Sequence, residues 1–314
     1  MNASIGIIMD PIEGIKIAKD SSFAMMLAAR RRGWTIHYMQ QHELFSDGET
    51  SRARSAIIIP MDDTELWYEV ISQQEIQLSS LDVLMMRKDP PYDIEYITTT
   101  WLLDQAEREG SLVVNKPSSL RDANEKLFIT RFPQCCAPLL VSRESERLRA
   151  FTELHGDVVF KPLDSMGGHS IFRVRPDDPN LSVIIELMTD KGRKTIMAQK
   201  FIPEISAGDK RILLVDGEAV PYALARIPAK GEFRGNLVAG ATGVGVELSD
   251  RDRWICAQVS PVLKDMGILF AGIDVIGDYL SEINITSPTC IRELDRLYNL
   301  DIASRLLDAI EVRL

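Results

Sequence analysis

The sequence contains little cysteine and little histidine, with four of each among its 314 residues. Two of the cysteines, Cys135 and Cys136, are adjacent, and no two cysteines are spaced as Cys-x-x-Cys. No histidine stands near a cysteine at the spacing that metal ligands require. These absences argue against a fold held together by disulfides and against a structural zinc site.

Long apolar segments are also missing. No apolar run approaches the roughly 18 residues that a membrane-spanning helix needs. The first residues, MNASIGIIMDPIEG, lack the basic start and the long apolar centre of a signal peptide. We therefore expect a cytoplasmic protein that has no membrane partner.

The sequence has fewer basic than acidic residues. It contains 36 lysines and arginines and 46 aspartates and glutamates, so the formal net charge is -10. This balance repels a phosphate backbone, and the sequence has no long basic stripe. We therefore expect no nucleic-acid partner. Local groups of lysine and arginine inside an acidic protein favour a compact anionic ligand instead, such as a nucleotide phosphate.

What the chain does have is 45% hydrophobic residues, enough for a substantial core in two or three compact units. In the first third, apolar runs bounded by turn residues alternate with segments of helical spacing. The pattern predicts strands at 4–9, 34–39, 81–87 and 112–115 and helices at 20–33 and 97–109. This alternation is typical of a parallel α/β unit.

A second region begins near Arg121. Residues 122–132 are predicted to be helical, and the sequence that follows is rich in strand-forming residues, with turns at 216–218 and 277–278. The segment 231–245 has five glycines and few large side chains. We expect it to be a mobile loop, because it buries too little surface to order itself.

The stretch VVFKPLDSMGGHSIFRV, residues 158–174, is predicted to be a hairpin with a glycine-containing loop. Gly167 and Gly168 allow positive φ angles and a close approach of the backbone, so that backbone N–H groups of the loop can surround phosphate oxygens. Lys161, at the end of the first strand, can supply charge. The alternative is an ordinary hairpin turn, since the loop matches neither common phosphate-binding glycine motif.

The stretch FAGIDVIGDYLSEINITSP, residues 270–288, is predicted to be a second hairpin. A three-residue connection, 277–279, places Asp274 opposite Glu282, with Asn284 on the same face. The isoleucines and the valine then share the other face, whereas a two-residue connection mixes carboxylates and isoleucines on both faces. Two carboxylates and an amide oxygen suit Mg²⁺ held together with nucleotide phosphates. The alternative is a half-exposed hairpin whose polar residues face water.

Six runs together resemble the bacterial glutathione synthetases, which are members of the ATP-grasp ligases. In chain order they are MRKDPP, VNKPSSLRDANEKL, KPLDSMGGHSIFRV, GDKRILLVDGE, RGN and EINITSPTCIRE, and they cover nearly the whole chain. The resemblance implies a fold of mixed α/β and α+β type, with an N-terminal parallel α/β domain followed by a two-lobed ATP-grasp fold. The implied division is 1–122 for the substrate domain, 123–200 for the small lobe and 201–314 for the C-terminal lobe.

The resemblance also implies a reaction in which ATP activates the cysteinyl carboxylate of γ-glutamylcysteine as an acyl phosphate. Glycine then attacks this intermediate, which yields glutathione, ADP and phosphate. The implied small-molecule partners are ATP, γ-glutamylcysteine and glycine, the implied metal is Mg²⁺ or Mn²⁺, and the implied assembly is a homo-oligomer, either a dimer or a tetramer.

Residue roles follow from the matching positions. For the nucleotide, the resemblance implies Lys126 and Lys161 at the phosphates, Gly167 and Gly168 in the loop over them, Gln199, Lys200, Phe201 and Ile202 at the adenine, and Asp209 at the ribose. For the metal it implies Asp274, Glu282 and Asn284. For the reacting groups it implies Arg211, Arg226, Arg234 and Asn236, with Ser21 and Arg87 at the donor peptide and Arg292 at the acceptor carboxylate.

Several of these side chains also have structural interpretations, since Ser21 can cap a helix and Arg87 can pair with Asp89 or Asp93. The sequence departs from the family at Thr242, where an arginine is expected, and at His169, where a small residue is usual. A related ligase that uses another amine, and a nucleotide-binding regulatory protein without ligase activity, are therefore alternative hypotheses.

Overall fold

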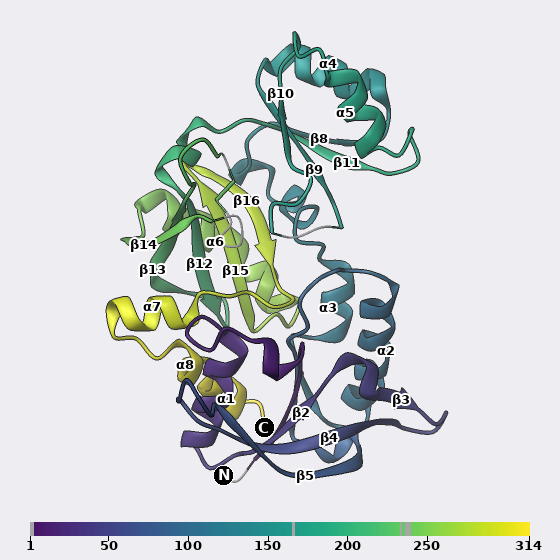
Figure 1. Cartoon of the computed structure of the whole chain (residues 1–314), viewed down its shortest axis with the longest axis vertical. Coiled ribbons are helices and arrows are strands. Elements are labelled where there is room, and N and C mark those ends of the chain that lie inside the picture. Colours follow the sequence, from purple (N-terminus) through teal and green to yellow (C-terminus); the bar gives the residue numbers. More distant parts are fainter. Residues whose placement is uncertain (1–2, 165–166, 233, 236–239) are drawn as a thin grey trace.

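Three sheets organise the chain, as the computed structural model shows for all residues except 1–2, 165–166, 233 and 236–239. Figure 1 shows them one above another, with the N-terminal domain at the bottom, the C-terminal lobe in the middle and the small lobe at the top. The fold is mixed α/β, as the sequence predicts. Each sheet falls within one of the three predicted ranges, and the division itself stays a prediction.

The N-terminal sheet has the order β3-β4-β2-β1-β6-β7, with β5 paired to β4. Its strands are β1 (Ser4–Ile8), β2 (Thr35–Met39), β3 (Leu44–Ser46), β4 (Ser51–Pro60), β5 (Tyr68–Gln77), β6 (Val83–Met86) and β7 (Leu112–Val114). The parallel pairs β2-β1, β1-β6 and β6-β7 confirm the predicted α/β unit. Strands β3, β4 and β5 pair antiparallel and were not predicted.

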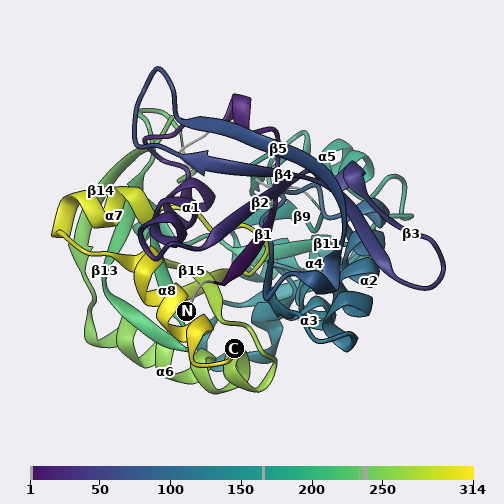
Figure 2. The same cartoon turned by 90° about the horizontal axis from the view of Figure 1, so that it is seen from below.

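Helices cover both faces of this sheet. Figure 2 shows α1 (Ser21–Arg31) on one side, and α2 (Ile94–Arg108) and α3 (Pro117–Asp122) on the other. The Asp20 side chain accepts a hydrogen bond of 2.7 Å from the Phe23 N–H, so Asp20, rather than Ser21, caps α1. Helix α2 begins three residues before its predicted start, because Asp93 caps it in the same way.

The small lobe is a four-stranded sheet of order β10-β9-β11-β8. Its elements are β8 (Leu139–Ser142), α4 (Ser145–His155), β9 (Val158–Pro162), β10 (Phe172–Val174), α5 (Leu181–Met188) and β11 (Ile196–Lys200). Strands β9 and β10 are antiparallel, which confirms the predicted hairpin around the glycine-containing loop. A small core from both helices and three strands, which includes Leu148 and Phe160, holds the lobe together.

The C-terminal lobe is a five-stranded antiparallel sheet of order β14-β13-β12-β15-β16. Its strands are β12 (Asp209–Val215), β13 (Glu218–Ile227), β14 (Thr242–Glu247), β15 (Phe270–Ile276) and β16 (Tyr279–Asn284), and its helices are α6 (Asp250–Asp265), α7 (Ile291–Tyr298) and α8 (Ile302–Glu311). Alternating residues of β12 pack in two different hydrophobic cores, one on each face of the sheet. Ile212 packs in the core that contains α6, and Leu213 in the core that contains α8 and α1.

The prediction of a helix over 122–132 was wrong. Helix α3 ends at Asp122, and the only helical element in the rest of this range is a 3-10 turn, Phe128–Arg131. The Asn124 side chain accepts hydrogen bonds from the N–H groups of Lys126 and Leu127, at 3.1 and 3.0 Å. A side chain that binds the local backbone in this way competes with helix formation, which explains why the helix does not continue.

The predicted three-residue connection between β15 and β16 was also wrong, although the facing pair it implied was right. Ile276 pairs with Tyr279, so the connection has two residues, Gly277 and Asp278. A β-bulge farther along the ladder restores the register, and Asp274 faces Glu282. The extra residue is Ser281, which is buried and whose hydroxyl donates to the Asp274 carbonyl at 3.1 Å.

The segment 231–245 is only partly the loop that was predicted, because Thr242 begins β14, which pairs with β13. A Cβ added at Gly245 would lie 2.6 Å from the ring of Tyr298, which stacks on Tyr222 at a centroid distance of 3.7 Å. Glycine at this position therefore permits close packing of the strand. From the sequence, the glycine content of the segment was interpreted only as a sign of flexibility, and the close packing at Gly245 was not predicted.

Among the residues that the structure describes, no helix combines the length and the apolar character needed to cross a membrane.

Candidate active site

A pocket opens where the small lobe meets the C-terminal lobe. Residues from β9, β11, β12, β15 and β16 line it, so both sheets contribute. Its lining residues are Val159, Lys161, Ile171, Gln199, Lys200, Phe201, Ile202, Ile205, Asp209, Arg234, Gly235, Ile276, Ser281 and Glu282. The structure thus brings together all five residues predicted at the adenine and the ribose. The apolar residues Val159, Ile171, Ile205 and Ile276 were not predicted, because they come from four separate segments.

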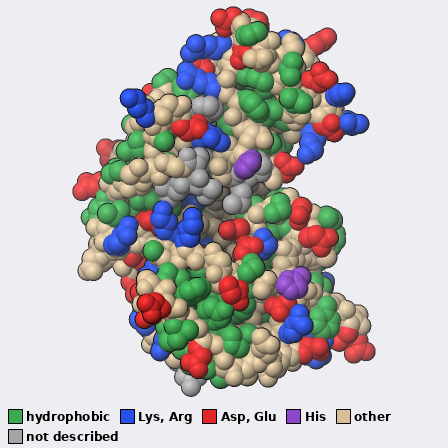
Figure 3. Space-filling model, viewed as in Figure 1, with side chains coloured by type: hydrophobic (Ala, Val, Ile, Leu, Met, Phe, Trp, Pro, Cys, Tyr) green, Lys and Arg blue, Asp and Glu red, His purple; other side chains and the backbone are tan. Residues whose placement is uncertain are grey.

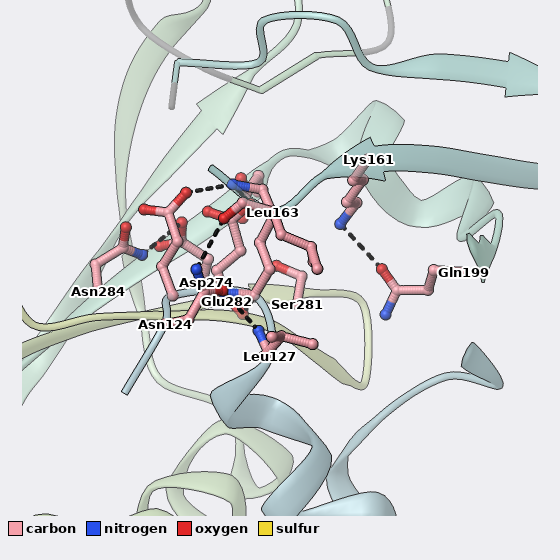
Figure 4. A network of polar contacts seen from close by, with 12 residues as sticks. Asn124, Leu127, Lys161, Leu163, Gln199, Asp274, Ser281, Glu282 and Asn284 are labelled. Atoms are coloured by element: carbon pink, nitrogen blue, oxygen red, sulfur yellow. Dashed lines mark hydrogen bonds and ion pairs between the residues drawn. The ribbon is translucent and has the colours of Figure 1, made fainter. Parts of the chain in front are cut away.

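Two buried polar atoms at this pocket have no hydrogen-bond partner among the described residues: Nε2 of Gln199 and Oδ1 of Asp209. The Gln199 oxygen accepts a hydrogen bond of 3.0 Å from Lys161, as Figure 4 shows. An unpaired buried polar atom is unfavourable unless a bound molecule satisfies it. The pocket therefore offers one donor and one acceptor to a ligand. Burial also lowers the pKa of Lys161, although carboxylates nearby oppose that effect.

Deeper in the site, Asp274 lies between two arginines. Its carboxylate accepts from Arg211 Nη2 and from Arg226 Nη2, at 2.8 Å each. Arg226 also contacts Asp209 at 2.5 Å, so one buried network joins four side chains. Burial alone would raise the pKa of Asp274, but the two guanidinium groups hold it at about 2. Burial raises the pKa of Asp209 to about 6, against the influence of Arg226.

A second charged group surrounds Lys126. Its ammonium contacts Glu125 and lies 3.9 Å from Glu282. Burial would lower the pKa of Lys126, but these two carboxylates raise it overall. Burial and the charge of Glu282 raise the pKa of Glu125. The sequence analysis did not predict Glu125 as a residue of the site. Its position next to Lys126, a predicted phosphate-binding lysine, was the only signal that could have indicated it.

The predicted metal-binding residues lie together. Asp274 and Glu282 face each other across the β15-β16 ladder, and the side-chain amide of Asn284 reaches within 3.4 Å of Asp274 Oδ2 (Figure 4). The described part of the chain has no cluster of three His, Cys, Asp or Glu side chains arranged for a metal. Two carboxylates and an amide nevertheless fit Mg²⁺, which commonly takes its remaining ligands from water and phosphates.

The two glycine-containing segments touch through Arg234. Its Nη1 donates to the Gly168 carbonyl at 3.3 Å, and its Nη2 contacts Glu232 at 2.5 Å. Gly167 and Gly168 have φ angles of 67° and 78°, a conformation that glycine adopts without strain. The predicted residue Asn236 lies outside the described residues. Thr242, at the position where the resemblance led us to expect an arginine, is exposed at the start of β14.

The three residues predicted to bind the peptide and the acceptor do not line this pocket. The Ser21 hydroxyl accepts from the Ile291 N–H at 3.2 Å. Arg87 is buried and donates to the Pro288 carbonyl at 2.9 Å. Arg292 donates to Asp62 at 2.7 Å. All three side chains join the N-terminal domain to residues 288–292 in this structure, and their substrate-binding roles stay predictions.

Solved structures with the same fold place the chain in a class. It superimposes on D-cycloserine synthetase DcsG with a TM-score of 0.69, at 12% identity and with 98% of this chain and 99% of that one covered. It also superimposes on the ATP-grasp ligase PsnB in complex with a minimal precursor, with a TM-score of 0.65, at 18% identity and with both chains fully covered. The fold, with a pocket between two lobes, is that of the ATP-grasp ligases.

Sequence comparison narrows the class to one family. Residues 3–121 match the prokaryotic glutathione synthetase N-terminal domain, and residues 125–299 match the ATP-grasp domain of the same family. The glutathione synthetase of Pseudomonas putida is 56% identical over 314 residues, which is 100% of this chain and 99% of that protein. The glutathione synthetase of Vibrio cholerae is 57% identical over 310 residues, with 99% and 98% covered. The chain belongs to the prokaryotic glutathione synthetase family.

Proposed function

We propose that this protein joins γ-L-glutamyl-L-cysteine to glycine at the expense of ATP, forming glutathione, ADP and phosphate. Family membership over the whole chain supports the reaction. The observation that carries the proposal at the level of residues is the single buried network of Arg211, Arg226, Asp209 and Asp274. It lies beside Lys126 and Glu282, where the nucleotide phosphates are expected.

ATP would occupy the pocket between the lobes. Its adenine would lie between the apolar side chains there, with Gln199 as a hydrogen-bond donor, and Asp209 would accept from a ribose hydroxyl. Lys126 and Lys161 would reach the phosphates. The low pKa of Asp274 keeps it ionised at neutral pH, so it can serve both as a metal ligand and as a partner of the arginines.

Asp274, Glu282 and Asn284 would hold Mg²⁺, or Mn²⁺ in its place. When bound, the metal ion would offset charge on the phosphate oxygens. Side chains of the protein would position the substrates and stabilise the charges that form during the reaction. Arg211 and Arg226 would hold the peptide carboxylate for in-line transfer of the γ-phosphoryl group, which turns a poor leaving group into a good one. The arginines would also stabilise the oxyanion that forms when the amine attacks.

The acyl phosphate must be kept from water until the amine reacts. The contact between Arg234 and Gly168 joins the two glycine-containing segments, and Arg234 lines the pocket. We infer that these segments close over the bound substrates and exclude water. A homo-oligomeric assembly, a dimer or a tetramer, is a further part of the proposal and rests on the family resemblance alone.

The test is to measure phosphate release from ATP and Mg²⁺ in the presence of γ-glutamylcysteine, with and without glycine, and to determine the product mass. We expect release that depends on glycine and a product with the mass of glutathione. Release that requires a different amine would instead identify a related ligase, and would explain the threonine at position 242. Binding of ATP without release under any amine would contradict ligase activity.

A further inference from the structure

Glu125 has no role in the reaction proposed above, although it lies among the residues that carry it. Its side chain is only 18% exposed. It follows α3, where the chain leaves the N-terminal domain for the small lobe, and Figure 3 shows a deep hollow in the surface between these two parts. A carboxylate at such a depth needs partners, because burying a charge is costly unless other groups offset the cost.

The backbone around Glu125 is fixed on two sides. The Glu125 carbonyl accepts a hydrogen bond of 2.9 Å from the N–H of Ile283, the residue between two predicted metal ligands of β16. The side chain of the preceding residue, Asn124, donates to the Leu163 carbonyl at 2.8 Å. These bonds tie the residue to β16 and to the loop after β9, so the direction of its carboxylate is set by both lobes.

Each oxygen of the Glu125 carboxylate has a partner of its own. Oε1 contacts the ammonium of Lys126. Oε2 faces the Asn284 amide, whose orientation follows from its neighbours. With the amide nitrogen toward Glu125, Nδ2 donates to Oε2 at 3.2 Å and Oδ1 accepts from Arg211 Nη2 at 3.2 Å. The reverse orientation brings two acceptors together and two donors together, and offers only a long contact of 3.4 Å to Asp274.

This orientation decides which atom of Asn284 a metal ion would meet. An amide binds Mg²⁺ through its oxygen, whereas its nitrogen is a donor. With Nδ2 held by Glu125, the amide atom that lies 3.4 Å from Asp274 Oδ2 is the oxygen. Two acceptor oxygens then lie side by side on the strands β15 and β16, and such a pair attracts a cation.

We propose that Glu125 is a positioning residue, which holds the Asn284 side chain with its amide oxygen toward the metal position. The ion pair with Lys126 occupies the other oxygen of Glu125, so the carboxylate acts through Asn284 and is not itself a metal ligand. This inference rests on the proposed function, in which Asp274, Glu282 and Asn284 hold Mg²⁺. Hydrogen-bond partners behind metal ligands typically change metal affinity or activity by about 10- to 100-fold.

The substitution Glu125→Gln should reverse the arrangement. The new side chain has one acceptor oxygen, which the ammonium of Lys126 takes, so its nitrogen faces Asn284. The Asn284 amide then turns its oxygen to that nitrogen and its own nitrogen to the metal position. Adding Asn284→Asp repairs the defect, because a carboxylate accepts from the glutamine nitrogen with one oxygen and offers the other to the metal.

The test measures nucleotide affinity rather than turnover. Isothermal titration of the full chain with a non-hydrolysable ATP analogue is carried out once with Mg²⁺ and once with EDTA. The variants are Glu125→Gln, Asn284→Asp and the two combined. The matched controls are Glu186→Gln, Asn180→Asp and their combination, because both of these side chains are exposed on the small lobe.

With Mg²⁺, we expect Glu125→Gln to weaken binding of the analogue by about 10- to 100-fold. With EDTA its affinity should be unchanged or higher, because the phosphates no longer compete with Glu125 for Lys126. Adding Asn284→Asp should recover most of the loss seen with Mg²⁺. Asn284→Asp alone should not tighten binding, because it places two carboxylates against each other, and the controls should match the wild type.

An equal effect of Asn284→Asp with and without Glu125→Gln would overturn the proposal, as would a loss of the same size with EDTA and with Mg²⁺. If Glu125→Gln does not fold, Glu125→Asp replaces it, since it keeps the charge and withdraws the carboxylate from Asn284. The loss should then again depend on Mg²⁺. Wild-type protein whose affinity for the analogue ignores Mg²⁺ would instead contradict the metal site of the proposed function, so the two failures are distinguishable.

Discussion

Several buried charges of the site have a partner of opposite sign. Asp274 has two arginines, and Lys126 has two carboxylates. A buried charge without a partner is costly, so removing any one of these groups should affect its neighbours as well. The clearest substitution at this scale is one that keeps the shape of a side chain and removes only its charge.

Replacing Glu282 with glutamine makes that change at a proposed metal ligand. We expect turnover to fall by roughly one to two orders of magnitude at limiting Mg²⁺, because a charge-assisted interaction of about 1.5–3 kcal/mol is lost. Raising the Mg²⁺ concentration should restore part of the lost turnover. The measurement is the rate of phosphate release as a function of Mg²⁺. An unchanged rate at limiting Mg²⁺ would contradict the metal assignment.

Asp295, on α7, provides a prediction about pH. Burial and the neighbouring Asp301 raise its pKa to about 6. Between about pH 4 and pH 6 the folded state therefore keeps a proton on Asp295 that the unfolded state has lost. Proton binding at Asp295 stabilises the folded state fully below about pH 4, and this stabilisation declines as pH rises from about 4 to 6. In Asp295→Asn the amide oxygen can still accept from the Ile302 N–H. The difference in Tm, wild type minus variant, should fall over this pH range, and a constant difference would contradict the prediction.

At the scale of elements, the hairpin β15-β16 and the strand β14 show how local irregularities position the site. The bulge at Ser281 turns Glu282 toward Asp274, and the packing of Gly245 against Tyr298 anchors one end of the 231–245 segment. The other end follows β13, which holds Arg226. The segment is thus attached at both ends to strands of the site.

Cutting this segment should separate binding from ligation. Lys230 is exposed and precedes Gly231, so limited trypsin treatment is expected to cleave there. We expect ATP binding to stay nearly intact and ligation to fall at least tenfold, because the acyl phosphate would lose its protection from water. Isothermal titration with an ATP analogue and phosphate release measure the two properties.

The uncut control is Lys230→Gln under the same treatment, which should keep both properties. Losses of equal size in binding and ligation after cleavage would count against closure of the segment over the substrates.

At the scale of the whole molecule, hydrogen bonds join the N-terminal domain to the C-terminal lobe. The buried Asn115 side chain donates to the Phe270 and Ile285 carbonyls, at 2.7 Å each, and accepts from the Phe270 N–H at 2.9 Å. Helix α8, at the end of the chain, packs against α1 near its beginning. The two parts therefore pack against each other through a shared core.

Replacing Asn115 with alanine would leave three buried backbone groups without partners. We expect the free energy of unfolding to fall by at least about 2–3 kcal/mol, since each such group costs about 1 kcal/mol or more. Denaturant unfolding measures the change. The control is Asn180→Ala, because Asn180 is exposed and its side chain makes no capping bond to α5. A similar small change in both variants would contradict the role of Asn115.

Much of the fold could be predicted because it depends on neighbours in the chain. The strands β1, β2, β6 and β7, the helix α1 and the glycine-containing hairpin follow from local apolar spacing and from turn residues. The prediction of a helix over 122–132 was wrong, because the helical spacing of apolar residues there does not show that the Asn124 side chain binds the backbone. The antiparallel strands β4 and β5 were missed as well.

The amino-acid sequence by itself determined the class of protein, since the order of its motifs and the residues able to hold phosphate, metal and carboxylate can be read along the chain. Only the tertiary structure decided which charges meet. It joined Asp274 to Arg211 and Arg226, placed Glu125 beside Glu282, and directed Arg292 toward Asp62. The reason is physical: backbone preferences act over a few residues, whereas an ion pair depends on which strands lie side by side and how deeply they are buried.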